Sequence, residues 1–236
     1  MKVMKVMFVA LSVLVVTGLA QATTFSTGTA GTCDPTGSST ATVSGNSGNP
    51  VNASATVTTS GSTITIVLKN CFASPTTVAQ NISDVFFTVA GASGGSLGTQ
   101  TASYINIDGS GNATSTTDSD TWGLDTAFTG SSYHLTDLGF GTATPAETII
   151  GPGPYCASND GSICGNKPHN PFINQTATFT ITGVSGTLGA ISGVDISFGT
   201  TPSSAPTTVP EPSSLLMFGS GLFGVAGILR RRFLRA

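Results

Sequence analysis

Four cysteines are the residues of this chain best placed for covalent chemistry, and they are Cys33, Cys71, Cys156 and Cys164. An even count indicates two disulfides in an oxidising compartment. Three pairings are possible, and proximity in the sequence favours Cys33–Cys71 and Cys156–Cys164. On the chain-entropy estimate, a loop of about 38 residues contributes ~4 kcal/mol and a loop of about 8 residues ~2.5 kcal/mol. A zinc site is disfavoured because Cys156 and Cys164 lack the two-residue spacing of a zinc knuckle, and His169 is their only nearby histidine.

A nucleophilic hydrolase needs a base beside its nucleophile, and the chain has only two histidines, His134 and His169. The residues around His134 alternate as in a strand, which predicts a half-exposed strand histidine. His169 lies between two loop-forming residues, which predicts an exposed loop position. We therefore expect no enzymatic activity.

Carboxylates gather in the segment from Asp108 to Asp125, with Asp118 and Asp120 between them. Paired carboxylates are the machinery of glycoside hydrolysis, and hard oxygen ligands in the loop Asp108–Asp120 suit Ca²⁺. The loop does not follow the EF-hand pattern, because its sixth position is Ala113 and its twelfth is Ser119. A solvated loop is therefore the favoured interpretation, and no cofactor or metal is expected.

One tryptophan and three tyrosines offer faces on which sugars stack, and they are Trp122, Tyr104, Tyr133 and Tyr155. Together they could line a carbohydrate-binding platform. A lone tryptophan in a β-sandwich is more often part of the core. The sequence leaves both interpretations open.

Short segments rich in Thr, Val, Ile and Phe predict strands throughout the body of the chain. Residues 53–59 and 62–70 alternate apolar and polar residues around a Ser-Gly-Ser turn, which predicts a hairpin. Further strands are expected at 84–89, 104–108, 133–140, 176–182 and 193–199. Loops are expected at 91–100 and 151–171, the second closed by Cys156–Cys164. Many short strands separated by turns favour an all-β fold, an antiparallel β-sandwich.

Charged residues make up only 8% of the chain, so solubility depends on hydroxyl and amide groups. The body holds ten acids but only two bases, Lys69 and Lys167, so its net charge is 2 − 10 = −8. So few basic residues and so large an excess of acids exclude a nucleic-acid-binding function for this domain.

The two ends of the chain have the composition of export signals. Lys2 and Lys5 precede an apolar run that ends in Ala20-Gln21-Ala22, which predicts a secretory signal peptide over 1–22. At the other end, residues 213–229 carry no charge and would span ~25 Å as a helix, at the short end for a bilayer. The basic cluster Arg230, Arg231, Arg232 and Arg235 follows and predicts a cytoplasmic C-terminus.

Val209-Pro210-Glu211-Pro212, the apolar segment and the arginines together form a tripartite tail. The tail resembles the PEP-CTERM sorting signal of Gram-negative bacteria, which the membrane protease exosortase recognises. The resemblance implies exosortase as a partner, transient anchoring in the inner membrane, release toward the cell surface or matrix, and association with exopolysaccharide. The expected organisation is a signal peptide (1–22), a β-rich exported domain (23–199), a Pro/Thr/Ser linker (200–208) and a sorting signal (209–236).

The expectation for function is an exported, exosortase-processed surface or extracellular-matrix protein without catalytic activity. The alternative is a carbohydrate-binding β-sandwich module tethered at the cell surface. Glycan binding that is abolished by Trp122→Ala would distinguish the carbohydrate-binding module from a passive matrix component.

Overall fold

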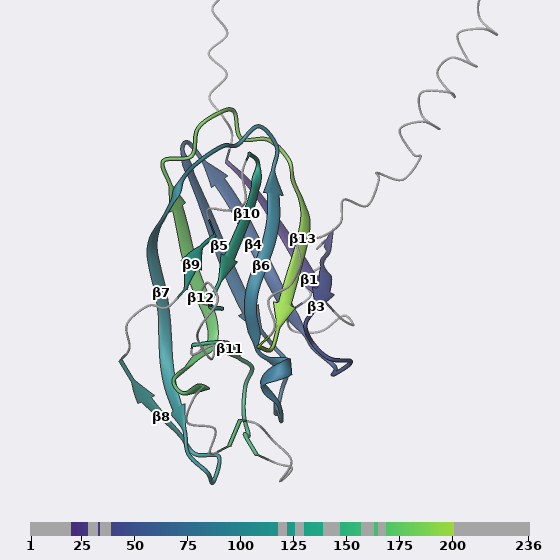
Figure 1. Ribbon diagram of the computed structural model, residues 1–236, viewed down its shortest axis with the longest axis vertical. Coiled ribbons are helices and arrows are strands. Elements are labelled where there is room, and N and C mark those ends of the chain that lie inside the picture. The colour runs from purple at the N-terminus through teal and green to yellow at the C-terminus, as the bar shows by residue number, and fades with distance from the viewer. Residues whose placement is uncertain are drawn as a thin grey trace, which may run out of the picture. The chain divides into compact units, whose positions relative to one another are not determined.

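The computed structural model describes residues 20–27, 33, 39–117, 122–125, 130–138, 147–156, 163–164 and 169–200. In these residues the chain is all-β, with one short 3₁₀ turn, η1 (Val78–Gln80), and no α-helix (Figure 1). The predicted all-β class is confirmed. Residues 1–19 of the predicted signal peptide, the linker after Thr200, the motif 209–212, the apolar segment 213–229 and the basic tail 230–236 lie outside the described residues.

Thirteen strands form one hydrogen-bonded sheet that is arranged as two layers (Figure 1). The first layer has the order β1-β4-β5-β12-β7, with short strands at both edges. Its members are β1 (Gln21–Thr27), β4 (Ala53–Ser60), β5 (Thr63–Asn70), β12 (Phe172–Thr182) and β7 (Ser96–Ile107), with β2 (Ser39–Thr40) beside β1 and β8 (Ala113–Thr116) beside β7.

The second layer is built around β6 (Ile82–Val89), which pairs with β10 and β13. Its other members are β10 (Ser132–Thr136), β9 (Gly123–Leu124), β13 (Ile191–Phe198) and β3 (Thr42–Ser44). A two-residue strand, β11 (Ile149–Ile150), pairs with β12 on one side and β6 on the other, and so joins the two layers.

The sheet is mixed rather than purely antiparallel. Three short strands, β2, β11 and β3, run parallel to β1, β12 and β13 respectively. The prediction of a purely antiparallel sandwich is wrong on this point, because a strand of two or three residues carries too little pattern to be recognised in the sequence. The long strands pair antiparallel, as the alternating segments predict.

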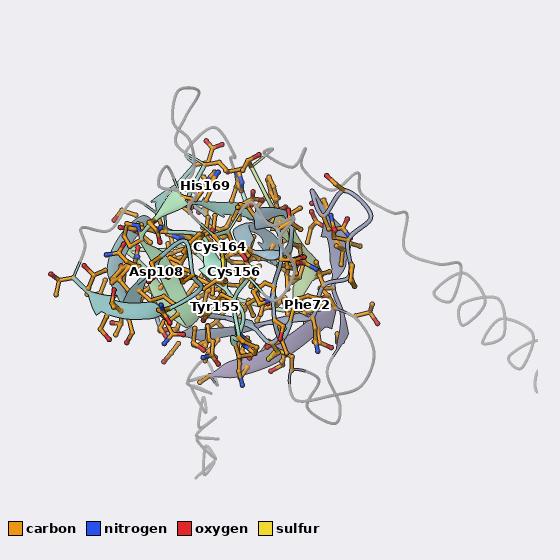
Figure 2. All side chains as sticks on the ribbon, turned by 90° about the horizontal axis from the view of Figure 1, so that it is seen from below. Phe72, Asp108, Tyr155, Cys156, Cys164 and His169 are labelled. Carbon is orange, nitrogen blue, oxygen red and sulfur yellow. A yellow bond between two sulfur atoms is a disulfide. The ribbon has the colours of Figure 1, made fainter. Side chains whose placement is uncertain are left out.

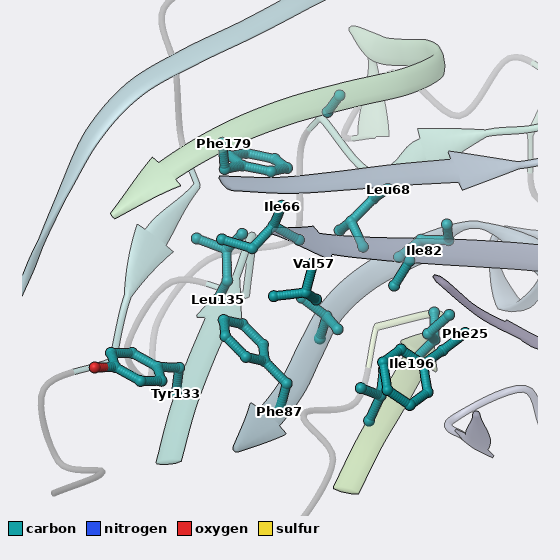
Figure 3. Packing of buried hydrophobic residues seen from close by; sticks show 14 of the residues in the cluster. Phe25, Val57, Ile66, Leu68, Ile82, Phe87, Tyr133, Leu135, Phe179 and Ile196 are labelled. Atoms are coloured by element: carbon teal, nitrogen blue, oxygen red, sulfur yellow. The ribbon is translucent and has the colours of Figure 1, made fainter. Parts of the chain in front are cut away.

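The core lies between the layers and follows the period-two alternation of the strands. Val57, Ile66, Leu68 and Phe179 of the first layer point toward the side occupied by Phe87, Leu135 and Ile196 of the second layer (Figure 3). All seven side chains are buried. Fully burying a side chain of this size contributes roughly 1.5–3 kcal/mol. The alternation in 53–59 and 62–70 therefore predicted the inward face correctly.

A fully buried asparagine, Asn70, organises the end of the core where β5 stops. Its Nδ2 group donates to the carbonyls of Gln80 and Ile149, at 2.8 and 2.9 Å, and its Oδ1 accepts the N–H of Phe72 at 3.0 Å. These three bonds connect β5, η1 and β11. A buried amide with its bonds satisfied in this way fixes one arrangement of the three segments.

Two predicted boundaries differ from the structure. Residues 96–100, expected in a loop, form the first part of β7, because pairing with β12 holds Gly- and Ser-rich residues that have little strand propensity of their own. β1 begins at Gln21 and pairs with β4 from that residue. A cut after Ala22 would thus remove the first two residues of this strand. Within the described ranges, no helix combines the length and apolarity that a membrane crossing requires.

Candidate functional site

The four cysteines form two disulfides, Cys33–Cys71 and Cys156–Cys164, which is the pairing favoured by sequence proximity. Cys33 is buried against the outward side of the first layer, where its sulfur lies 3.6 Å from the carbonyl of Lys69. The Ser54 hydroxyl lies 3.9 Å from the same sulfur. This disulfide therefore fastens residue 33 over one corner of the layer.

The second disulfide lies at one end of the domain, beside a small separate core. Figure 2 shows Asp108, Tyr155, Cys156 and Cys164 gathered at this end. The small core consists of Val78, Ile105, Ile107, Ile150, Ile163 and Phe172, with Tyr155 and both cysteines packed against it. Gly111 has φ +82°, and a Cβ there would collide with the Tyr155 carbonyl. The glycine lets the Asp108 turn and the disulfide loop approach closely.

His134 lies on β10 and is 5% exposed, so the predicted strand is confirmed but the predicted half-exposure is wrong. Its Nδ1 is 3.3 Å from Asp125 Oδ2, and its Nε2 is 3.6 Å from Asp84 Oδ1. Its ring stacks on Phe86 with centroids 3.7 Å apart. Both ring nitrogens therefore face carboxylates. A catalytic triad instead directs one nitrogen at a hydroxyl nucleophile.

The outward side of the second layer continues this polar network across β13 and β3. Asp195 accepts hydrogen bonds from the hydroxyls of Thr42 and Ser44, at 2.6 and 2.7 Å. Ser44 and Ser197 also share a hydrogen bond of 2.8 Å. Asp84 and Asp195 are both buried. Buried carboxylates with such partners hold strands together, since removal of one partner leaves a desolvated charge.

The outward side of the first layer is different, because most of its side chains are partly exposed threonines. One row runs across four strands through Thr58, Thr65, Thr180 and Thr99. The Oγ1 atoms of Thr99 and Thr180 are 2.9 Å apart, as are those of Thr24 and Thr56 in the neighbouring row. Lys69, which lies opposite Ser54 and Thr176, is the only charged residue in the five long strands of this layer. The arrangement can hydrogen-bond to a hydrated, uncharged polymer without stacking on aromatic rings.

Carboxylates in the described part of the chain are mostly withdrawn from the surface. Of the six acids there, only Asp108 is exposed, Asp125 is half-buried, and the other four are buried. Over these described residues the negative charge is therefore much less accessible to a partner than the sequence suggests.

The aromatic residues do not form a sugar platform. Trp122 is 4% exposed, packs on Phe179 at 4.9 Å between ring centroids, and donates from Nε1 to the Glu147 carbonyl at 3.1 Å. Tyr104 and Tyr133 are buried in the same core, where burial raises the pKa of Tyr133. Tyr155 is half-buried at the small core. The core interpretation of Trp122 is confirmed.

Asp108 closes its own turn. Its Oδ1 accepts the N–H groups of Ser110 and Asn112, and its Oδ2 accepts from the Asn112 side chain at 2.9 Å. The side-chain bond from Asn112, then the backbone bonds, lower the pKa of this exposed carboxyl. Asp118 and Asp120 lie outside the described residues, and Asp125 contacts His134 instead. Within the described part of the chain, no three His, Cys, Asp or Glu side chains group as metal ligands.

His169 is 8% exposed, so the predicted exposed loop position is wrong. It lines a cavity of about 260 Å³ together with Ser47, Thr77 and Gly199, among other residues. The cavity lies beside the end of β13, where the domain passes into the linker. Its lining includes the side chains of His169, Ser47 and Thr77 beside the apolar Val78 and Ala79, which suits water or a small polar molecule.

Residues 208–232 match the family described as the PEP-CTERM protein-sorting motif. The chain carries a PEP-CTERM sorting motif. A PEP-CTERM motif implies a membrane-anchored precursor that exosortase processes for export, as the residues Val209–Pro212 predict. No curated protein and no solved structure matches the chain.

Sequence reasoning missed the buried carboxylates Asp84 and Asp195. For Asp195 the signal was present, because Val194, Ile196 and Phe198 lie in the opposite phase. This alternation predicts that Asp195 faces outward, but it does not predict that outward positions of this layer are buried. Asp84 gave no such signal, because the apolar Ile82 and Phe86 lie in its own phase. The threonine rows were likewise visible as alternation, but their alignment depends on strand register.

Proposed function

We propose that this chain is a non-catalytic surface or matrix protein that exosortase releases to the cell exterior, where it associates with exopolysaccharide. The observation that carries the proposal is the sorting motif at residues 208–232. Two disulfides in the body agree with an oxidising destination. The threonine rows of the first layer supply the surface that would contact a hydrated polysaccharide.

The absence of catalysis is part of this proposal. His134 supports it, because both its ring nitrogens face carboxylates and its ring is stacked and buried. A hydrolase screen of the purified chain is expected to give no turnover. Turnover that disappears in His134→Gln would contradict the proposal.

The body is also proposed to need no cofactor. Asp108 supports this, because hydrogen bonds from its own turn already occupy its carboxylate. Chelation of divalent ions is expected to leave the melting temperature unchanged. A fall in the melting temperature that added Ca²⁺ restores would show a calcium site in the loop Asp108–Asp120.

Release is tested by the prolines of the motif. The double variant Pro210→Ala, Pro212→Ala loses the fixed φ angles that keep the motif extended. It should stay in the membrane fraction with its tail intact. The matched control, Pro202→Ala with Pro206→Ala in the linker, should be released like the natural chain. Equal release of both variants would defeat the proposed role of the motif.

Polysaccharide contact is tested on the first layer. Thr65→Glu and Thr180→Glu place charges in the centre of the threonine rows, and together they should reduce co-sedimentation with the exopolysaccharide of producing cells. Ser192→Glu on β13, an exposed position of the second layer, is the control. Unchanged co-sedimentation of the Thr65/Thr180 variant would remove this face from the proposal.

A further inference from the structure

One edge of the first layer is open. β7 pairs with β12 along one side, whereas β8 covers only Tyr104–Ile107 on the other side. Figure 1 shows β7 at the border of its layer, with β8 beside one end of it. Residues 96–103 therefore have no strand on their outer side among the described residues.

The hydrogen bonds of β7 show which backbone groups point to the open side. The N–H of Thr99 donates to Thr180 Oγ1, and that of Ile107 to Asn170 Oδ1, both on the β12 side. The N–H of Asp108 instead donates to Asn112, on the β8 side. Because consecutive residues of a strand point their backbone groups to opposite edges, those of Gln100 and Ala102 face the open edge.

Each end of this open stretch is bounded. Toward the C-terminus β8 occupies the edge from Tyr104. Toward the N-terminus the register between β7 and β12 shifts between Gln100 and Leu97, which is a β-bulge. In this bulge the N–H of Thr99 donates to the hydroxyl of Thr180 instead of to a backbone carbonyl. Between these limits lie two N–H groups and two carbonyls, those of Gln100 and Ala102.

We propose that this edge pairs with the same edge of a second copy of the chain. In an antiparallel arrangement with a two-fold axis at Thr101, Gln100 of each copy lies opposite Ala102 of the other. All four open groups of each copy are then used, and four backbone hydrogen bonds form. The two Thr101 side chains meet as a cross-strand threonine pair.

The composition of the edge fits a second copy better than a foreign peptide. β7 holds no charged residue and no proline, the two devices that most often block edge pairing. In the proposed register Gly98 of one copy lies beside Tyr104 of the other, at a groove of about 360 Å³ where β8 separates from β7. Glycine enters such a groove without a side chain to place. The exposed side chains Thr99, Thr101 and Ser103 are small and offer no pocket for a peptide's larger residues.

Four hydrogen bonds between five-residue stretches make a small contact, below the size of stable interfaces. The dimer is therefore weak and forms at high local concentration, as on a crowded surface. Pairing would also continue the threonine rows from one copy into the next.

A cysteine substitution tests the register in the full chain. All four natural cysteines are paired, so a new thiol can react only with a second copy or another protein. In Thr101→Cys the two Cα atoms would be about 4.5 Å apart in a non-hydrogen-bonded pair, within the range of a disulfide. In Thr99→Cys the offset of four residues separates the two positions by ~13 Å, too far for a disulfide.

We expect a covalent dimer of Thr101→Cys on a non-reducing gel, formed several-fold more than the dimer of the equally exposed control Thr99→Cys. Equal dimer in both variants would mean random collision, and no dimer in Thr101→Cys would mean that the edge does not self-pair. An adduct with a different protein would mean a foreign occupant. Each of these three results overturns the proposal.

A second measurement needs no new thiol. Sedimentation of the full chain in detergent should show a monomer–dimer equilibrium that Thr101→Lys shifts to monomer, because two lysines then face each other across the axis. Thr65→Lys, on the same face but inside the sheet, should leave the equilibrium unchanged. If both variants behave like the natural chain, the edge is not the contact. Neither experiment depends on exosortase processing.

Discussion

The outward sides of the two layers have the same alternating sequence pattern but opposite physical character. On the first layer the outward residues are half-exposed threonines in hydrogen-bonded rows, such as Thr65 and Thr180. On the second layer they are buried groups, with His134 between Asp84 and Asp125 and with Asp195 bonded to two hydroxyls. Among the described residues, buried charged groups therefore connect the strands of the second layer, whereas the outward side of the first layer is nearly uncharged.

The largest loss of stability is expected from removal of the disulfide Cys33–Cys71, which lies over the outward side of the first layer. The double variant Cys33→Ser, Cys71→Ser loses the constraint on a loop of about 38 residues and should lose ~4 kcal/mol of unfolding free energy. The matched variant Cys156→Ser, Cys164→Ser loses the disulfide that closes a loop of about 8 residues and should lose ~2.5 kcal/mol of unfolding free energy. Denaturant unfolding of both variants checks the order. A larger loss at the shorter loop would contradict it.

The second effect tests the buried side. His134→Ala removes the group between two carboxylates, one of them fully buried, and the ring that stacks on Phe86. We expect a loss of ~3 kcal/mol of unfolding free energy, because the buried carboxylate of Asp84 loses the histidine that faces it. Thermal unfolding measures the loss. A change below ~0.5 kcal/mol, the usual range at surface positions, would show that the polar groups on this side do not stabilise the fold.

A third and smaller effect tests the open side. Thr65→Ala removes a partly exposed hydroxyl and one methyl group from the centre of the threonine rows. Surface substitutions of this kind change stability by within ~0.5 kcal/mol. The same thermal unfolding experiment serves as the measurement, with His134→Ala alongside. A loss as large as that of His134→Ala would mean that the two sides do not differ in the way described.

The smallest effect concerns Asp108, the exposed exception among the described acids. Hydrogen bonds from Asn112 and Ser110 lower its pKa below the ordinary value of 3.8. Because the folded pKa is the lower one, the turn is stabilised above the ordinary pKa and loses that stabilisation as the pH falls through the folded pKa. An NMR titration measures the pKa. Asn112→Ala should raise it, whereas Ser110→Ala, which keeps its N–H, should not.

Much of the inward side of the fold follows from the sequence. The alternation in 53–59 and 62–70 predicted the hairpin of β4 and β5 and its buried residues, and proximity favoured the pairing of the cysteines. The short parallel strands β2, β3 and β11 could not be predicted, because they exist through long-range pairing and not through their own pattern. The burial of His134 and Asp84 could not be predicted from the sequence either, because alternation indicates which way a side chain points but not whether other residues cover it.

The sorting motif is the reverse case, because the sequence carries it completely. Pro210, Glu211 and Pro212, the uncharged segment and Arg230–Arg232 are recognised from composition and order alone. The open edge at Gln100 and Ala102 depends on strand register, and the composition of residues 91–100 predicts a loop instead of a strand.

The most direct test of the account is the intact mass of the protein collected from producing cells with and without exosortase. With exosortase, the account predicts a protein that ends near the motif Val209–Pro212, lacks the segment 213–236 and has no cysteine that can be alkylated before reduction. Without exosortase, the tail should remain. Retention of the intact tail in both strains would contradict the account.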